Sequence, residues 1–252
     1  MWTDRQAIEI FHLLFVAQFG RRVDKARFVI KGGCNLRFFC RSIRYSADID
    51  FDVRGMEVLT LRENMDAILA SPALKQALRA KQLEIEHVTP AKQTDTTQRW
   101  KLGIRLDGGQ PIPTKIEFSR RHGLDSDHVL EAVDSEIIRT YELYPVLAQH
   151  YSREAAFRQK IAALSRRTAT QARDIFDLKL LLDRGASQQE LPPDVAAEIH
   201  RAVENAMTIG FDEFSGQVRA YLAPEYQDFY GSRHAWESLQ DEVVRALEKR
   251  AP

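Results

Sequence analysis

Residues 31–52 read KGGCNLRFFCRSIRYSADIDFD, and the rest of the chain is interpreted around this stretch. It begins with two glycines and ends in the alternating segment 46–52. Because successive side chains of a β-strand point to opposite faces, Ile49 and Phe51 would lie on one face and the polar residues on the other. The stretch therefore predicts a strand with one apolar face and one acidic face.

The acidic face of this strand would carry Ser46, Asp48, Asp50 and Asp52. Like charges on one strand face repel each other and lower strand propensity. A divalent cation would offset that repulsion, and Mg²⁺ is typically held by one or two carboxylates together with substrate phosphates. The alternative is a solvated strand edge whose acids discourage edge-to-edge pairing.

The glycine pair, Gly32 and Gly33, favours the first interpretation. Two glycines after a strand let the backbone turn tightly and approach a ligand closely. If a helix begins near Cys34, its first N–H groups are suited to a phosphate, and Lys31 stands beside them. A phosphate-binding turn and a pair of carboxylates in one unit indicate nucleotide chemistry.

This pattern resembles the signature of the nucleotidyltransferase superfamily. The longer form, KGG-x-x-L followed by R-x-S-x-D-I-D-F-D, is similar to the AbiEii/AbiGii-type toxins of bacterial abortive-infection and toxin–antitoxin systems, which include the MenT-type toxins. The matching positions are Gly32, Gly33, Leu36, Arg44, Ser46, Asp48, Asp50 and Asp52. Cys34 departs from the pattern, because Ser or Thr is usual there. A thiol is a poorer donor than a hydroxyl, which puts a side-chain contact to phosphate in doubt and leaves the backbone contacts.

Composition narrows the classes of protein. The chain has 252 residues, enough for one large or two modest domains, and 36 basic residues balance 36 acidic ones. This balance does not indicate a strongly basic nucleic-acid-binding protein, so any RNA or DNA contact must come from a local patch. The two cysteines are too few for a disulfide scaffold and indicate reduced thiols. The seven histidines are scattered and do not indicate a zinc site. No apolar run is long enough to span a membrane and the first residues predict a helix, so we expect a cytoplasmic protein.

Periodicity predicts the other elements. Helices are expected at 3–19, with Thr3 as N-cap, and at 56–81, split at Ser71 and Pro72. Strands are expected at 83–88, 99–106 and 137–144, with 89–98 as a polar loop. From about 152 the pattern is helical, which places a domain boundary near 145–150.

The segment 113–120, PTKIEFSR, predicts a strand with Lys115 and Glu117 on one face and Ile116 and Phe118 on the other. Phosphoryl transfer with two metals needs a carboxylate from a separate strand, and Glu117 is the candidate. A Lys–Glu surface pair explains the pattern equally well from the residues alone. The resemblance favours the functional interpretation, since a K-[IL]-E strand recurs at this point in the family.

Residues 152–184 hold a second motif block, with helices expected to about 167 and over 171–182. A lysine on a helix facing the acids could meet a triphosphate as a point charge, and Lys160 is such a residue. The block K-I-x-A-L-x-x-R, followed by R-D-x-x-D-L, again resembles the AbiEii-type toxins. The resemblance implies that Lys160 is the catalytic lysine and that Arg173, Asp174 and Asp177 are the R-D-x-x-D positions. Capping and ion pairing are the alternative roles, which we favour for Asp177, whereas for Asp174 we favour a role in the site.

The predicted fold is therefore α+β: a nucleotidyltransferase-like mixed sheet with flanking helices over 1–148, then a helical domain over 149–252 that contributes to the active site. The predicted function is Mg²⁺-dependent (or Mn²⁺-dependent) transfer of a nucleotide from an NTP to an RNA acceptor such as the 3′ end of tRNA, by a toxin with a cognate antitoxin. The alternatives are transfer to a small hydroxylated molecule and a non-catalytic binding module.

The predicted site residues fall into three groups. Those expected to be catalytic are Asp48, Asp50, Glu117, Lys160 and Asp174. Those expected to bind the nucleotide are Lys31, Gly32, Gly33, Ser46 and Arg173. The expected metal ligands are Asp48, Asp50 and Glu117. The tail 192–252 has aromatic residues that we interpret as packing, and its sequence does not indicate the acceptor.

Overall fold

The computed structural model describes residues 2–120, 127–186 and 190–251. The chain forms two compact units: unit 1 comprises 1–41 and 45–151, and unit 2 comprises 42–44 and 152–252. The division falls a few residues after the expected boundary and adds the short segment 42–44 to the helical unit. Within the described ranges, no helix is long and apolar enough to cross a membrane.

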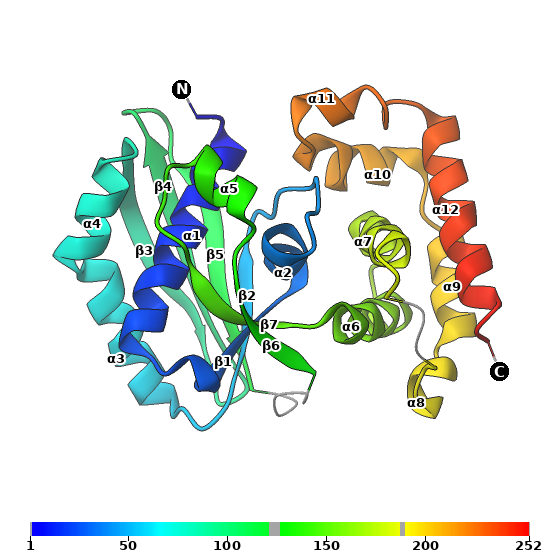
Figure 1. Ribbon diagram of the computed structural model, residues 1–252, viewed down its shortest axis with the longest axis horizontal. Coiled ribbons are helices and arrows are strands. Elements are labelled where there is room, and N and C mark those ends of the chain that lie inside the picture. The colour runs from blue at the N-terminus through cyan, green and yellow to red at the C-terminus, as the bar shows by residue number, and fades with distance from the viewer. Residues whose placement is uncertain (1, 121–126, 187–189, 252) are drawn as a thin grey trace. The chain divides into compact units, whose positions relative to one another are not determined.

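Unit 1 is built on a mixed sheet (Figure 1). Among its described residues, seven strands lie in the order β3-β4-β5-β2-β1-β7-β6. Their bounds are β1 Phe28–Lys31, β2 Ile49–Val53, β3 Leu83–Gln93, β4 Thr97–Leu106, β5 Ile112–Ser119, β6 His128–Ala132 and β7 Leu147–Tyr151. The pairs β2·β5 and β1·β7 are parallel, and the other neighbouring strands are antiparallel. The predicted α+β class with a mixed sheet is confirmed.

Helices α1, α3 and α4 lie together on one side of this sheet (Figure 1). The helices of unit 1 are α1 Asp4–Arg22, α2 Gly32–Phe39, α3 Val58–Ala70, α4 Pro72–Arg79 and α5 Ser135–Thr140, with a 3₁₀ turn at Lys25–Arg27. Thr3 caps α1 in a capping box with Gln6, and Ser71 accepts a hydrogen bond from the Leu74 N–H at the start of α4. Both predicted helix starts are confirmed.

The core is organised around the alternation of β2. Ile49, Phe51 and Val53 are buried, whereas the aspartates between them are half-buried on the opposite face. The Phe51 ring packs against Phe118, with ring centroids 4.9 Å apart, and also against aromatic rings of α1. This burial fixes which face of the strand the acids occupy.

The β3–β4 hairpin is longer than predicted. The polar loop expected at 89–98 is wrong, because β3 continues to Gln93 and β4 already begins at Thr97. Its polar composition reflects an exposed extension of the hairpin, since most residues of β3 after Leu83 are exposed. Pro90 is tolerated because β3 is an edge strand.

The strand expected at 137–144 is also wrong, because Ser135–Thr140 forms helix α5. The Asp134 carboxylate accepts a hydrogen bond from the Glu136 N–H, and this cap outweighs the β propensity of the two isoleucines that follow. Strands β6 and β7 were not predicted, and β7 occupies the segment expected to be the domain boundary.

Unit 2 is helical. Its helices are α6 Arg153–Arg166, α7 Ala172–Asp183, α8 Pro193–Ala196, α9 Ile199–Met207, α10 Phe211–Gln217, α11 Pro224–Gln227 and α12 Arg233–Glu248, with a 3₁₀ turn at Arg219–Tyr221. The helices predicted to 167 and over 171–182 correspond to α6 and α7. Trp236 is buried and stacks on Phe214, as expected for packing, whereas Phe229 is 74% exposed.

Truncating Phe51 tests the role of β2 in the core. Phe51→Ala is expected to lower the free energy of unfolding by about 3–5 kcal/mol, because the cavity loses contacts with several aromatic rings. Urea denaturation measures the change. Leu59→Ala, at a site that is 65% exposed, is the control and is expected to change stability by less than about 0.5 kcal/mol. Equal effects of the two substitutions would contradict this account of the core.

Candidate active site

Charged side chains form a row across the middle of the sheet in unit 1. Strand register places Asp50 between Lys31 of β1 and Glu117 of β5, and Glu117 lies opposite Arg99 of β4. Arg99 Nε donates a hydrogen bond to Glu117 Oε2 at 2.6 Å. Asp50 and Glu117, predicted from distant segments, are therefore neighbours on one face of the sheet, which we call the polar face.

Asp48 lies just before β2 and is held from several directions. Its Oδ1 accepts a hydrogen bond from the Lys115 N–H at 3.1 Å, and its Oδ2 pairs with Lys115 Nζ at 3.0 Å. Its carbonyl oxygen accepts hydrogen bonds from the Ser46 hydroxyl at 2.8 Å and the Cys34 thiol at 3.3 Å. Both side chains therefore order the backbone that carries Asp48.

Cys34 is buried, and burial raises the pKa of its thiol well above the ordinary value. Its sulfur also lies 3.6 Å from His12 Nδ1, inside the core. Ser46, predicted to bind the nucleotide, uses its hydroxyl within this structure on the Asp48 carbonyl. Although Cys34 stands where Ser or Thr is usual, its thiol still donates a hydrogen bond to the Asp48 carbonyl just before β2.

The glycine turn lies against the acids. Gly32 has a φ of +67°, and a Cβ there would stand 3.3 Å from Asp50 Oδ2. Helix α2 begins at Gly32 with no side-chain cap from Lys31, so its first N–H groups are open to a ligand. The Lys31 ammonium pairs instead with Asp52 Oδ1 at 2.5 Å, and the other oxygen of Asp52 accepts a hydrogen bond from the Tyr151 hydroxyl.

The surroundings of Asp50 disfavour its charged form. Burial is the largest cause that raises its pKa; Lys115 opposes the rise, and Glu117 adds to it. A bound cation would favour the charged carboxylate and so lower the free-energy cost of burying it. Within the described ranges, no three Asp, Glu, His or Cys side chains are arranged as a metal-binding group. The Asp48 and Glu117 carboxylates are instead paired with Lys115 and Arg99.

Unit 2 contains a buried network of charges. Lys160 Nζ lies 2.8 Å from Asp174 Oδ1 and 2.6 Å from Asp177 Oδ2. Arg44 makes a two-pronged contact with Asp177 through hydrogen bonds of 2.9 Å to both carboxylate oxygens, and Arg167 pairs with Asp174 at 3.2 Å. Burial alone would raise the pKa of Asp177, but Arg44 and Lys160 outweigh it and lower the pKa.

Arg173 stands apart from this network. It is half-buried on α7, next to Asp174. Its guanidinium has no ion pair or hydrogen bond among the described residues, in contrast to the paired Arg44 and Arg167. An unpaired guanidinium is suited to an anionic ligand.

The predicted site residues thus fall in both units. Unit 1 brings together the predicted acids and Gly32, whereas Lys160, Arg173 and Asp174 belong to unit 2, so a joint site stays a prediction. The partners Arg99 and Lys115 were not predicted as part of the site. No local signal could have identified Arg99, because only strand register brings it beside Glu117.

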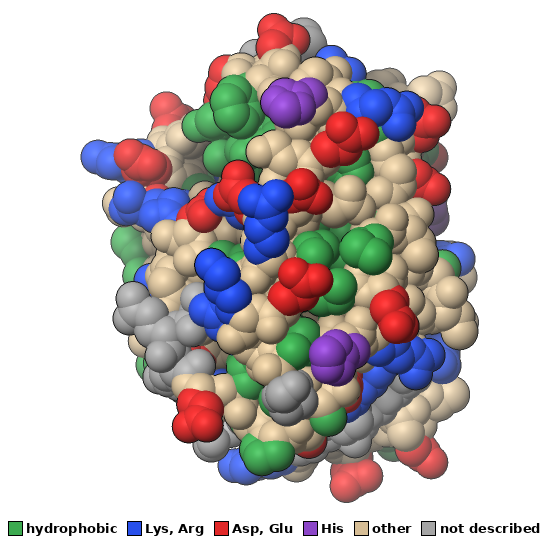
Figure 2. Space-filling view, turned by 90° about the vertical axis from the view of Figure 1, so that its right-hand side faces the viewer, with side chains coloured by type: hydrophobic (Ala, Val, Ile, Leu, Met, Phe, Trp, Pro, Cys, Tyr) green, Lys and Arg blue, Asp and Glu red, His purple; other side chains and the backbone are tan. Residues whose placement is uncertain are grey.

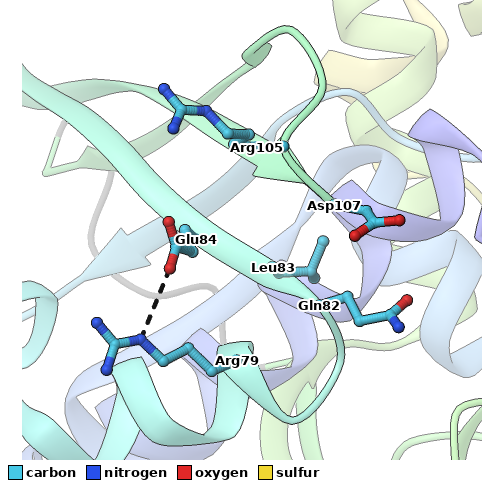
Figure 3. Close-up of a pocket in the computed structure, with 7 residues that line it drawn as sticks. Arg79, Gln82, Leu83, Glu84, Arg105 and Asp107 are labelled. Atoms are coloured by element: carbon cyan, nitrogen blue, oxygen red, sulfur yellow. Dashed lines mark ion pairs between the residues drawn. The ribbon is translucent and has the colours of Figure 1, made fainter.

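A surface pocket of about 300 Å³ lies elsewhere in unit 1, at the end of β4 remote from Arg99 (Figure 3). Leu83 lies in the middle of the residues drawn, and the Arg79 and Glu84 side chains point toward each other, with Arg79 Nε 3.7 Å from Glu84 Oε1. Its lining residues are Arg79, Gln82, Leu83, Glu84, Arg105, Asp107 and Gly108. None of them is a predicted site residue.

Comparison with known families gives a match over most of the chain. The model of a family described as "Nucleotidyl transferase AbiEii toxin, Type IV TA system" matches residues 13–249. This range includes every predicted site residue in both units. Among curated proteins, none matches the sequence.

Three solved structures with the same fold come from Helicobacter pylori and Mycobacterium tuberculosis. JHP933 from Helicobacter pylori has a TM-score of 0.63 at 17% identity, over 99% of this chain and 96% of that one. A putative nucleotidyltransferase from H. pylori gives 0.61 at 19%, over 97% of both chains. MenT4, a nucleotidyltransferase toxin from Mycobacterium tuberculosis, gives 0.61 at 18%, over 99% and 94%. At these identities the likeness shows the fold.

Removing the charge of Asp177 tests the buried network. Asp177→Asn is expected to destabilise the protein by about 3–5 kcal/mol, because Arg44 and Lys160 lose a buried partner. Since the pKa of Asp177 is lowered on folding, its contribution is complete above the unfolded pKa of about 3.9 and is lost as pH falls through the folded pKa. Urea denaturation at neutral pH and at successively lower pH measures both effects.

The variant should therefore lose less stability than wild type on acidification. Asp183→Asn on the same helix is the control, because Asp183 is 57% exposed and its pair with Lys179 is expected to contribute less than about 1 kcal/mol. Parallel acid titrations of wild type and Asp177→Asn would contradict the assigned role.

Proposed function

The chain belongs to the AbiEii family of nucleotidyltransferase toxins of toxin–antitoxin systems, and from that premise we propose that it transfers a nucleotide from an NTP to an RNA acceptor such as the 3′ end of a tRNA. The observation that carries the proposal is the position of Gly32 against the Asp50 carboxylate. It joins a phosphate-binding turn to an acidic strand, which is the pairing that nucleotide transfer requires.

The glycine turn would hold the phosphates of the NTP. The first N–H groups of α2, at Gly32 and Gly33, have no side-chain cap, and a helix N-terminus favours negative charge. Gly32 also leaves space that a side chain would fill beside Asp50. The bound phosphates would thereby lie next to the acids of β2.

The acids fit a divalent cation by their chemistry, since carboxylate oxygens are the ligands that Mg²⁺ and Mn²⁺ prefer. Asp48, Asp50 and Glu117 would hold the ion, which would neutralise charge on the phosphates. The pKa of Asp50 is raised mainly by burial and further by Glu117, and this supports the proposal because a bound cation would favour the charged carboxylate. Lys115 and Arg99, which now pair with two of these acids, would then be released toward phosphate oxygens.

The helical unit would supply Lys160, Arg173 and Asp174. Lys160 would neutralise charge on the α-phosphate and the leaving pyrophosphate, and Asp174 orients it by a 2.8 Å contact. Arg173, without a partner among the described residues, would bind a phosphate oxygen. The acceptor hydroxyl would attack the α-phosphorus in line, form the new P–O bond and expel pyrophosphate, while Glu117 would take up the hydroxyl proton.

An RNA acceptor and an antitoxin are the proposed partners, and the cytoplasm the proposed site of action. Figure 2 shows one face of the molecule, on the side where α12 lies, and acidic and basic side chains are interspersed over it. With a net charge of zero, contact with RNA would depend on a local group of cations and not on the overall charge.

Nucleotide transfer is tested with the purified protein, each labelled NTP, Mg²⁺ and total RNA. Label is expected in the RNA, and Asp48→Asn or Asp50→Asn should lower the rate at least about 10²-fold, because each removes a carboxylate that would hold the divalent cation at the phosphates. The control is Asp66→Asn, at a side chain 64% exposed on α3, which should leave the rate unchanged. Label found only in small molecules would contradict the RNA acceptor.

Growth of a bacterial host on expression tests the toxin role. Wild type is expected to arrest growth, and Asp48→Ala should restore it, because arrest depends on the transfer reaction. Asp66→Ala should arrest growth as wild type does. If wild type is harmless and indistinguishable from Asp48→Ala, the toxin hypothesis fails; immunoblotting confirms equal expression of all three proteins.

A further inference from the structure

The polar face of the sheet continues beyond the acids onto the β3–β4 hairpin. Register extends the charged row to five strands, as Lys92 of β3 lies opposite Arg99 of β4. A second row places Thr89, Lys101 and Lys115 side by side, and a third places His87, Gly103 and Pro113. Directly opposed residues share a face, so all three rows belong to the polar face.

The third row contains an aromatic ring, the imidazole of His87, whose position depends on Gly103. The His87 imidazole occupies the space above Gly103, where an added Cβ would come within 2.6 Å of its Nδ1 and closer still to Cε1. Only glycine at position 103 leaves room for the ring. His87 and Pro113 are both exposed, so this aromatic ring is open to a ligand.

The two strands of the hairpin contribute positive charge without a counter-ion. Lys101 is exposed, and neither it nor Lys92 has an ion pair or hydrogen bond within the described part of the chain. Three acids of this face are already paired: Glu86 with Arg105, Glu117 with Arg99, and Asp48 with Lys115. Asp50 lies on β2, which β5 separates from the hairpin. The hairpin side of the face therefore has a surplus of positive charge.

We propose that this hairpin surface, formed by His87, Lys92 and Lys101, binds a single-stranded segment of the acceptor RNA and leads its 3′ end to the acids. The inference rests on the proposed function and names the surface that receives the acceptor. Along β4 the ring at row three is four residues from the charged row, roughly 13 Å. A base stacks on His87, and Lys101 and Lys92 bind the phosphates that follow.

Single-stranded RNA fits this surface better than a protein or a free nucleotide. An exposed aromatic ring beside unpaired lysines is the combination that binds an unpaired base and its backbone. A protein partner would require an apolar centre, whereas the exposed side chains in these rows are polar or charged apart from Pro113. In the proposed site the phosphates of an NTP are held by the glycine turn and the acids, so a free NTP would leave the lysines of the hairpin without a phosphate to bind.

Binding of a labelled single-stranded RNA oligonucleotide, without NTP, tests the surface. His87→Ala is expected to weaken binding roughly tenfold through loss of stacking. Lys101→Gln is expected to weaken it and to lower the slope of log K against log salt by about 0.7. The controls are His200→Ala and Lys75→Gln, an exposed histidine of α9 and an exposed lysine of α4, which should bind as wild type.

Gly103→Ala isolates the position of the ring. Its methyl group would displace the His87 ring and change no charge, so binding should weaken as in His87→Ala while the salt slope stays unchanged. The double variant that combines Gly103→Ala with His87→Ala should bind no more weakly than His87→Ala alone, because both substitutions remove the same contact. Additive losses would overturn the stacking role, and so would equal losses for a duplex of the same sequence.

Transfer assays separate this inference from the proposed function. If transfer to RNA occurs and these variants raise KM for the RNA with little change in kcat, the result supports both the hairpin surface and the proposed function. If transfer occurs and RNA binding and KM are unaffected, the hairpin surface is wrong and the function stands. If the variants weaken RNA binding and no NTP is transferred, the surface stands and the nucleotidyltransferase activity is wrong.

Discussion

The two-residue alternation of β2 is the constraint on which unit 1 depends. Ile49, Phe51 and Val53 are packed into the core, so Asp50 and Asp52 must face the other way. A shift of one residue would bury the aspartates and expose the Phe51 ring, at a cost far above the net stability of a domain. The hydrophobic core thus holds the acids in position, although none of them contributes to it.

The same constraint explains the cations around the acids. A central strand with acids on one face is unfavourable unless opposite charges oppose them, and Lys31, Lys115 and Arg99 do so through register and ion pairs. These pairs are half-exposed, so each contributes little to stability. In the proposed reaction these cations would already lie close to the bound phosphates and to Asp50, whose pKa is raised by burial and by Glu117.

Local signals in the sequence were sufficient wherever neighbours along the chain decide the structure. Thr3 and Ser71 start helices as predicted, and the alternation at 46–52 identified the acidic strand. The sequence failed where a competing signal or a distant partner decides. Asp134 capped a helix over residues with β propensity, and pairing with β4 extended β3 through a polar segment. The row from Lys92 to Lys31 depends on the registers of four strand pairs, which no single segment encodes.

The segment 42–44 shows how the two units share one motif. The chain leaves unit 1 after α2, contributes 42–44 to unit 2, and returns to unit 1 to form the acidic strand. Arg44 is fixed in unit 2 by its paired hydrogen bonds to Asp177 and by a backbone bridge to Leu222. Since Asp177 also contacts Lys160, one carboxylate holds both the lysine of the second motif and the arginine four residues before Asp48. Because breaking a buried ion-pair network is costly, both motifs depend on this carboxylate for stable folding.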